Sequence, residues 1–279
     1  MAQPTFSKSD DLSWSVEKRP LYFTGNDGQP VAWPDKMAIV RQDTGRCLGS
    51  VSDSYEPVQN SDLKTLITPM VEEGVLTVAN QGYLNHGAKV FIQAQIEQEF
   101  VVIGESYKGY ITLLNSHNGS SSVSVGPVMH RVICGNSFTA AYREIGQRFR
   151  HTEGVTERFL SSSAVIDFVD EAMKVYAGKV ETLAKTSCSG TQFRNALELI
   201  YQKEVKDMRE SFIDKLNHLF YNGAGNEGRT MYDCFNSVTE YSNHHARKTI
   251  SGNYYYANFG QGANAGRRAM EVLTELSAV

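Results

Sequence analysis

The sequence predicts an α+β fold, in which an N-terminal, mostly antiparallel sheet with a protruding hairpin is followed by a helical C-terminal half. Apolar residues change their spacing along the 279-residue chain. Before residue 136, short β-rich segments are separated by turn residues, as in strands joined by hairpins. After residue 136, apolar residues recur every three or four positions, as on one face of a helix. Strands that precede helices favour the α+β class.

We predict an irregular N-terminal arm over residues 1–36 and a single α+β domain over residues 37–279. The arm is polar, contains four prolines and includes the turn sequence Gly25-Asn26-Asp27-Gly28. Such clusters of turn-forming residues are typical of irregular structure. Within the domain, residues 37–135 are sheet-rich and residues 136–279 are helix-rich.

The elements of the domain follow from local patterns. A hairpin is expected at residues 37–40 and 47–51, with Asp43 and Gly45 as turn formers. A helix is expected at residues 61–71, because its apolar residues stand three and four positions apart. Further strands are predicted at residues 76–80, 88–96 and 100–103. Helical periodicity predicts helices within residues 138–145, 155–183, 191–220, 231–246 and 263–276.

The strongest hairpin signal lies in residues 110–137. Two β-rich segments flank a polar turn, and Asn118-Gly119 supplies the positive φ that a tight turn between twisted strands requires. The turn contains a dense set of hydrogen-bonding side chains: Asn115, Ser116, His117, Asn118 and Ser120. Two interpretations fit this turn. It is either a solvated loop whose side chains bond their own backbone, or a functional loop.

The turn resembles a motif of the phage and plasmid-like family described as domain of unknown function 932. In that family a segment close to LLNSHDGSSS precedes a strand ending in R-x-V-C-x-N, and residues 113–122, Arg131, Cys134 and Asn136 stand in the matching places. Further matches extend the resemblance from about residue 40 to residue 260. Asn118 replaces the usual Asp. This removes a metal ligand if the Asp bound a metal, and changes nothing if the Asp shaped the turn. The resemblance implies a mobile-element setting and no particular reaction.

The composition is that of a soluble globular protein, with 41% hydrophobic residues and a formal net charge of −4. The apolar runs are too short to cross a bilayer, and the first ten residues lack a signal-peptide pattern, so we expect a cytoplasmic protein of a bacterial host. The four cysteines include no CxxC pair, which disfavours disulfides and zinc. The charge is uneven, because residues 241–270 contain four basic residues and no acidic residue.

Signals for catalysis are weak. The seven histidines show no HxxxH or HxxE spacing of a metal site, and no nucleotide-binding fingerprint is present. Residues 223–228 are glycine-rich but lack a following Lys-Ser/Thr, so we interpret them as a loop between helices. A nuclease requires acidic residues gathered around a divalent cation, and no spacing singles out such a group. We therefore predict no catalytic residue, no metal and no cofactor.

Two segments combine cations with flat aromatic side chains, the groups that bind phosphates and exposed bases. The expected nucleic-acid contacts are Arg131, Arg143, Arg148, Arg150, Arg247, Lys248, Tyr254 and Tyr256. We expect the tyrosine segment to form a strand, on which Tyr254 and Tyr256 share one face and Tyr255 takes the other. The alternative for both segments is purely structural: a core helix with arginines on its wet side, and tyrosines that pack on the core.

The leading hypothesis is a non-catalytic protein that binds or anneals single-stranded DNA in a phage or plasmid recombination system. Its outline, a sheet followed by helices, is similar to that of the single-strand annealing recombinases of mobile elements. Because such proteins work as rings or filaments, a homo-oligomer belongs to the hypothesis, and no membrane partner is expected. The main alternative is a metal-dependent nuclease or anti-restriction protein with the turn at residues 115–122 in its active site. A protein-binding module is the third hypothesis.

Overall fold

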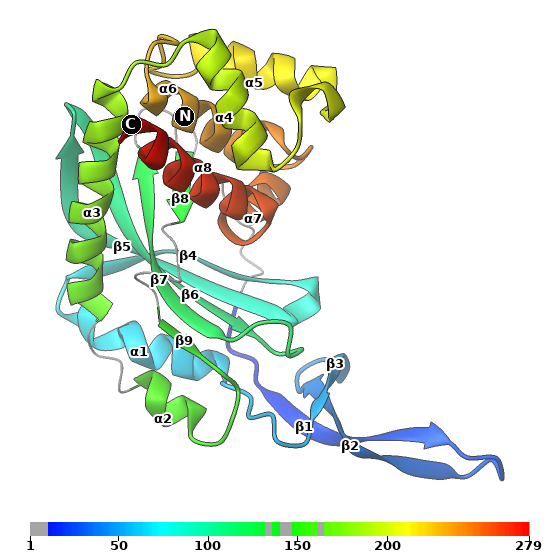
Figure 1. Cartoon of the computed structure of the whole chain (residues 1–279). Helices are drawn as coiled ribbons and strands as arrows, with labels where there is room; N and C mark the ends of the chain where they lie inside the picture. The colour runs from blue at the N-terminus through cyan, green and yellow to red at the C-terminus, as the bar shows by residue number, and fades with distance from the viewer. Residues whose placement is uncertain (1–10, 132–135, 140–146, 161–164, 279) are drawn as a thin grey trace.

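The α+β class is confirmed, since antiparallel sheets form the N-terminal half of the chain and helices form the C-terminal half (Figure 1). The structure is a computed structural model that describes residues 11–131, 136–139, 147–160 and 165–278. It contains a small three-stranded sheet, a larger six-stranded sheet and a set of helices that packs against the larger sheet.

The three-stranded sheet consists of β1 (Val16–Thr24), β2 (Pro30–Arg41) and β3 (Arg46–Ser52), which pair antiparallel in this order. The expectation of an irregular arm was therefore wrong for most of residues 16–36. Two of its prolines, Pro20 and Pro30, occupy positions that a sheet tolerates. Pro20 lies at a register shift of β1, and Pro30 is the first residue of β2. The outer half of the β1–β2 hairpin extends away from the body of the molecule (Figure 1).

The six-stranded sheet has the order β4-β5-β6-β7-β8, with β9 also paired to β7, and all its pairs are antiparallel. The strands are β4 (Leu76–Leu84), β5 (Lys89–Val102), β6 (Glu105–Ser116), β7 (Val123–Arg131), β8 (Asn136–Thr139) and β9 (Gln147–Phe149). The predicted hairpin is confirmed as β6–β7. The separate strand expected at residues 100–103 is instead part of β5, because an irregularity between Gln95 and Glu99 interrupts the pairing without ending the strand.

The helices largely follow the periodicity of the sequence. They are α1 (Asn60–Glu72), α2 (Val155–Leu160), α3 (Val165–Lys185), α4 (Gly190–Tyr201), α5 (Glu210–Asn222), α6 (Met231–Glu240), α7 (Ile250–Phe259) and α8 (Gln261–Ser277). A π-helical turn, η3 (Tyr241–His245), extends α6, and the short 3-10 helices η1 (Asn85–Gly87) and η2 (Val205–Asp207) join other elements. The helix expected from residue 138 was wrong at its start, which is strand β8, and residues 140–146 lie outside the described residues.

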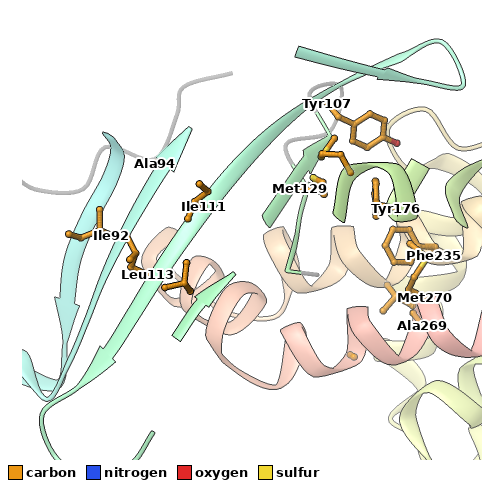
Figure 2. Close-up of a cluster of buried hydrophobic side chains, with 14 of the residues drawn as sticks. Ile92, Ala94, Tyr107, Ile111, Leu113, Met129, Tyr176, Phe235, Ala269 and Met270 are labelled. Atoms are coloured by element: carbon orange, nitrogen blue, oxygen red, sulfur yellow. The ribbon is translucent and has the colours of Figure 1, made fainter. Parts of the chain in front are cut away.

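The main core lies between one face of the six-stranded sheet and helices that include α3 and α6, whereas α7 packs on the opposite face against Phe91 and Gln93 of β5. Alternate residues of β5 and β6 point to the main core, among them Ile92, Ala94, Ile111 and Leu113 (Figure 2). At the other end of the same face, Met129 lies beside side chains from α3, α6 and α8 that include Tyr176, Phe235 and Met270. Side chains of the opposite face, such as Thr112 of β6 and Val128 of β7, are buried as well.

Candidate functional site

The turn of the β6–β7 hairpin is buried and does not protrude, which corrects the expected shape of this hairpin. The side chains of Asn115, Ser116 and His117 are fully buried. Asn115 Nδ2 donates to the carbonyl of Val58 at 2.8 Å, and the Tyr55 hydroxyl donates to the carbonyl of Ser116. The segment that leads into α1 therefore covers the turn, and only its outermost residues reach solvent.

Asn118 shapes the turn through its side-chain oxygen. Asn118 Oδ1 accepts from the Ser116 hydroxyl at 3.0 Å and from the Ser120 backbone N–H at 3.1 Å. Gly119 follows with a φ of 70°. The bonds to Oδ1 require only an acceptor, which Asn and Asp supply equally well. This geometry supports the turn-shaping interpretation of the position at which the family usually has Asp.

Two buried histidines lie beside the turn. Asn60 Nδ2 donates to the carbonyl of Trp14, so Asn60 Oδ1 accepts from His117 Nε2 at 2.9 Å, and His117 Nδ1 carries no proton. Burial lowers the pKa of His117 to about 3, and the nearby His151 contributes to the shift. His151 Nδ1 donates to the carbonyl of Glu56 at 3.0 Å, and burial lowers its pKa as well.

The second nitrogen of each histidine is unpaired within the described structure. His117 Nδ1 and His151 Nε2 are both buried and have no hydrogen-bond partner there. A proton on either nitrogen would be a buried donor without an acceptor. Both rings are held by aromatic neighbours: Trp14 lies 5.5 Å from His117, and Tyr55 stacks on His151 at 4.4 Å, between ring centroids. The turn and its histidines thus form a neutral, tightly packed cluster at neutral pH.

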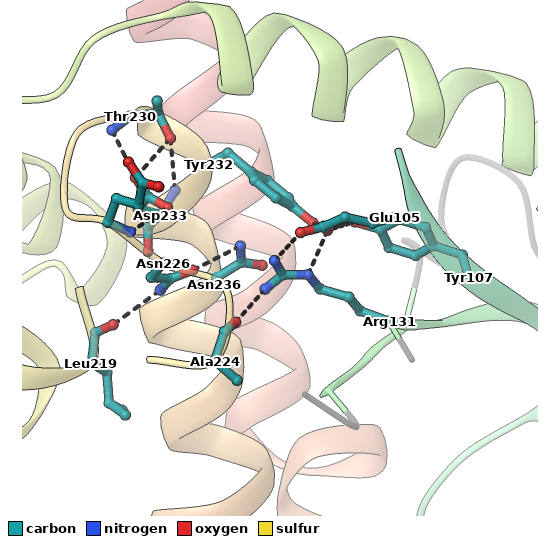
Figure 3. A network of polar contacts seen from close by, with 11 residues as sticks. Glu105, Tyr107, Arg131, Leu219, Ala224, Asn226, Thr230, Tyr232, Asp233 and Asn236 are labelled. Carbon is teal, nitrogen blue, oxygen red and sulfur yellow. Dashed lines mark hydrogen bonds and ion pairs between the residues drawn. The ribbon is translucent and has the colours of Figure 1, made fainter. Parts of the chain in front are cut away.

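Arg131 lies in the interior and not on the surface. Its side chain is 3% exposed and forms a two-pronged ion pair with Glu105, in which Nε donates at 2.7 Å (Figure 3). Arg131 Nη1 donates to the carbonyl of Ala224 at 3.0 Å, and the guanidinium lies 5.1 Å from the ring centroid of Tyr232. A phosphate could replace these partners only by opening the contact between β7 and the loop after α5.

Glu105 is held as a carboxylate by this network. Burial alone would raise its pKa, but the Arg131 guanidinium and the hydroxyls of Tyr232 and Tyr107 outweigh burial and keep the pKa below its usual range. The two hydroxyls also bond each other, and they lie 2.9 and 3.2 Å from the carboxylate. Burial raises the pKa of both tyrosines, so they remain neutral donors.

The loop at residues 223–228 joins α5 to the start of α6, as predicted. Asp233 organises the end of this loop, because its carboxylate accepts from the backbone N–H groups of Arg229 and Thr230, each at 2.9 Å. Asn226 Nδ2 donates to the carbonyl of Leu219 at 3.0 Å (Figure 3). These bonds fix the carbonyl of Ala224 in the position where Arg131 meets it.

The other arginines of the first segment differ in placement. Arg148 on β9 and Arg150 directly after it are exposed, whereas Arg143 lies outside the described residues. The guanidinium of Arg158 on α2 contacts the loop before this helix, where Nη1 donates to the carbonyl of Glu153 at 2.6 Å. The structure therefore does not bring the predicted arginines together, since Arg131 is buried while Arg148 and Arg150 are on the surface.

The tyrosine segment is a helix, α7, and the expectation of a strand was wrong. The Thr249 hydroxyl caps the helix by accepting from the Gly252 N–H at 3.1 Å, and Asn253 Oδ1 accepts from the Arg247 N–H at 2.6 Å. Successive residues of a helix are about 100° apart, so Tyr254 and Tyr256 do not share a face. Tyr254 turns inward, and its hydroxyl donates to Gln93 of β5 at 2.9 Å.

Tyr256 is half-buried, and the side chain of a basic residue packs on its ring. The guanidinium of Arg247 lies over its ring, 4.2 Å from the centroid. Arg247 and the adjacent Lys248 are both exposed. Of the second predicted segment, Arg247, Lys248 and Tyr256 thus remain available to a ligand, whereas Tyr254 serves the contact between α7 and the sheet.

The surface beside Arg247 gathers further basic side chains, which the sequence analysis missed. Burial lowers the pKa of His245, and the nearby Lys215, His244 and His218 lower it further. These groups come from α5 and from the π-helical turn η3. We call the following set the basic patch: Lys215, His218, His244, His245, Arg247 and Lys248. The signal that could have revealed it is the helical spacing of Lys215 and His218 combined with the basic run at residues 244–248.

The part of the chain that the structure describes contains no group of three or more His, Cys, Asp and Glu residues arranged to hold a metal. Cys47, Cys188 and Cys234 are free thiols. Among the described helices, none is both long enough and apolar enough to span a bilayer.

Comparison with known proteins identifies the family. A family model described as a domain of unknown function (DUF932) matches residues 47–273. Since the match spans most of the chain, the protein belongs to this family, as the turn motif indicated. No curated protein and no solved structure matches the chain. Strands β1 and β2 precede the matched residues.

Proposed function

We propose that the protein binds single-stranded DNA without cleaving it, and anneals strands in a phage or plasmid recombination system. The observation that supports this proposal most directly is the basic patch. It combines fixed cations, titratable histidines and a guanidinium stacked on a tyrosine. Polyanion binding depends on this kind of convergence, because each neutralised phosphate releases condensed counterions.

The charge around the patch favours an anionic ligand. Burial is the main cause of the lowered pKa of His245, and repulsion from the nearby Lys215, His244 and His218 adds to it, so basic groups lie close together on this surface. An anion that binds there relieves this repulsion. The segment from residue 241 to residue 270 contributes no acidic residue. This segment therefore carries positive charge in a chain with a net charge of −4, while α5 adds the exposed Asp214 next to Lys215.

The flat groups in the patch favour single strands. A guanidinium that lies flat on a tyrosine ring offers a planar surface on which an unpaired base can stack. Bases in a duplex stack on each other and do not offer a free face. The proposed site therefore differs from the predicted one. It includes Arg247, Lys248 and Tyr256, and it excludes Arg131 of β7, which is buried.

The proposal includes a homo-oligomer. A patch of this size contacts only a few nucleotides, so strand annealing requires several copies to hold one strand in register. Rings or filaments of identical subunits provide such a repeated surface.

Fluorescence anisotropy with labelled single- and double-stranded oligonucleotides, with and without magnesium, tests the proposal. The variant Arg247→Ala/Lys248→Ala should weaken single-strand binding for all sequences and reduce the salt slope by about 1.4, since each phosphate contact on a single strand contributes about 0.7. The matched control is Arg46→Ala/Lys185→Ala, which removes two exposed cations from β3 and from the end of α3. Equal affinity for the wild type and the patch variant would refute the proposal, and magnesium-dependent cleavage products would favour the nuclease alternative.

A further inference from the structure

Two cysteines from separate parts of the chain meet in the interior of the helical half. Cys188 lies in the connection between α3 and α4, and Cys234 lies near the start of α6. Both thiols are free, and the two residues are 3% and 0% exposed. They belong neither to the ion-pair network around Glu105 nor to the basic patch, so nothing described above gives them a role.

The backbone fixes the two cysteines next to each other. Ser187 and Thr230 are partners in an antiparallel bridge, and the Cys188 N–H donates to the carbonyl of Arg229 at 2.8 Å. Helix α6 begins directly after Thr230, and the Cys234 N–H donates to the carbonyl of Thr230 at 3.3 Å. Cys234 therefore lies one helical turn beyond the bridge that holds the connection with Cys188.

The two side chains contact each other through a hydrogen bond. This bond lowers the pKa of the Cys188 thiol, because the Cys234 thiol donates to the Cys188 sulfur, whereas burial raises the pKa of Cys234. Cys188 is therefore the thiol that ionises first, and Cys234 stays protonated beside it. A thiolate next to a second thiol is the arrangement in which one cysteine reacts with an oxidant and the other resolves the product.

Cys188 lies directly below the surface. Its neighbours Ser187 and Ser189 are both exposed, because the connection between α3 and α4 runs along the outside of the molecule. A local opening of this short connection is enough to admit a small neutral oxidant to Cys188. Cys234 is fully buried in the helix behind it, so the oxidant reaches Cys188 first.

We propose that Cys188 and Cys234 form a reversible disulfide when the protein meets hydrogen peroxide. The Cys188 thiolate attacks one peroxide oxygen and the O–O bond breaks, which gives a sulfenic acid and hydroxide. The Cys234 sulfur then attacks the sulfenic sulfur and loses its proton, and the S–O bond breaks as water leaves. The hydroxide takes the proton that Cys188 had released. Two thiols and one peroxide thus give one disulfide and two waters.

The disulfide closes a loop over residues 188–234, which contains α4, η2 and α5. A cross-link over a loop of this length restricts the unfolded chain and so stabilises the folded one. The loop includes Lys215 and His218 of the basic patch. The inference does not require DNA binding, and its test involves no DNA.

Peptide mapping of the full-length protein tests the proposal. The purified protein is treated with hydrogen peroxide, its remaining thiols are blocked with iodoacetamide under denaturing conditions, and it is digested with trypsin. Trypsin releases Cys188 in residues 186–194 and Cys234 in residues 230–247. We expect mass spectrometry to find these two peptides joined after peroxide and separate after dithiothreitol. The melting temperature of the oxidised protein should rise by several degrees.

The matched control is Cys47→Ser, which removes an exposed thiol of β3 and should leave both the joined peptides and the rise in melting temperature unchanged. Cys234→Ala should leave Cys188 as a sulfenic acid that a dimedone probe labels, and Cys188→Ser should leave Cys234 unmodified.

Three results would overturn the proposal. They are complete oxidation of Cys47 without joined peptides, a link from Cys188 or Cys234 to a different cysteine, and a melting temperature that falls when the two peptides are joined. Because the peptide map uses the wild-type chain, the decision does not depend on whether the variants fold.

Discussion

Acid should destabilise this protein because His117 is fully buried and resists protonation in the folded state. The perturbation is a decrease in pH from 7.5 to about 5, where an ordinary histidine is protonated. In the folded state the pKa of His117 is about 3 and not its usual 6.5, because the ring is buried and Nδ1 has no acceptor. At pH 5, His117 is therefore protonated in the unfolded chain and unprotonated in the folded chain.

The sign and size of the effect follow from this difference. A folded-state pKa that lies below the unfolded value means that stability is complete above pH 6.5 and decreases as the pH falls toward 3. Each pH unit in this window costs about 1.4 kcal/mol for one histidine, so the loss at pH 5 is about 2 kcal/mol. His151, whose pKa is lowered in the same way, adds to the loss.

Urea unfolding at a series of pH values measures this loss. The comparison is between the wild type and His117→Gln, whose amide can still donate to Asn60 but cannot take up a proton. The variant should be less stable at pH 7.5, and its free energy of unfolding should fall by about 2 kcal/mol less between pH 7.5 and 5. Parallel pH profiles for the two proteins would refute the argument.

Three further predictions concern the other residues of the site. Arg131→Met should lower the free energy of unfolding, measured by urea titration, by about 3 kcal/mol, because it leaves Glu105 without its cation. In samples that remain folded, this variant should change the DNA affinity measured by anisotropy only a little. DNA affinity should increase as the pH falls from about 7.5 to 5.5, since a bound phosphate favours the protonated form of His245, and His245→Gln should weaken this dependence in anisotropy titrations. Tyr254→Phe should lower the melting temperature because Gln93 loses a partner, whereas Tyr256→Ala should weaken single-strand binding more than it affects melting.

The elements that the sequence predicted well carry their own local signals. Asn118-Gly119 identified the β6–β7 hairpin, and the periodicity of α1 and α8 identified helices whose ends differ from the prediction by a few residues. The burial of the hairpin turn could not be read from its own polar residues. It depends on Tyr55, Val58 and Asn60, which lie about 57 residues earlier in the chain and fold over the turn.

Two errors have identifiable causes. Consecutive tyrosines favour strands, but the Thr249 cap and the docking of Tyr254 on β5 prevail in α7, because β propensity depends on context. Arg131 was assigned to the surface by its charge alone. Strand alternation from Val125 through Met129 places it on the core face, and this period-two signal was present in the sequence.

The contact between Arg131 and Ala224 has a consequence for how the chain unfolds. It joins the last residues of β7 to a loop more than ninety positions later, and Tyr232 of α6 closes the same network from the helical side. The Glu105–Arg131 ion pair belongs to the strand-rich part, and the helix-rich part buries it through the Tyr232 hydroxyl and the Ala224 carbonyl, so separation of the two parts exposes the pair to water and removes these two partners. We expect the two parts to melt in one cooperative transition, and a chain cut near residue 135 to give fragments that recover structure only when they are mixed.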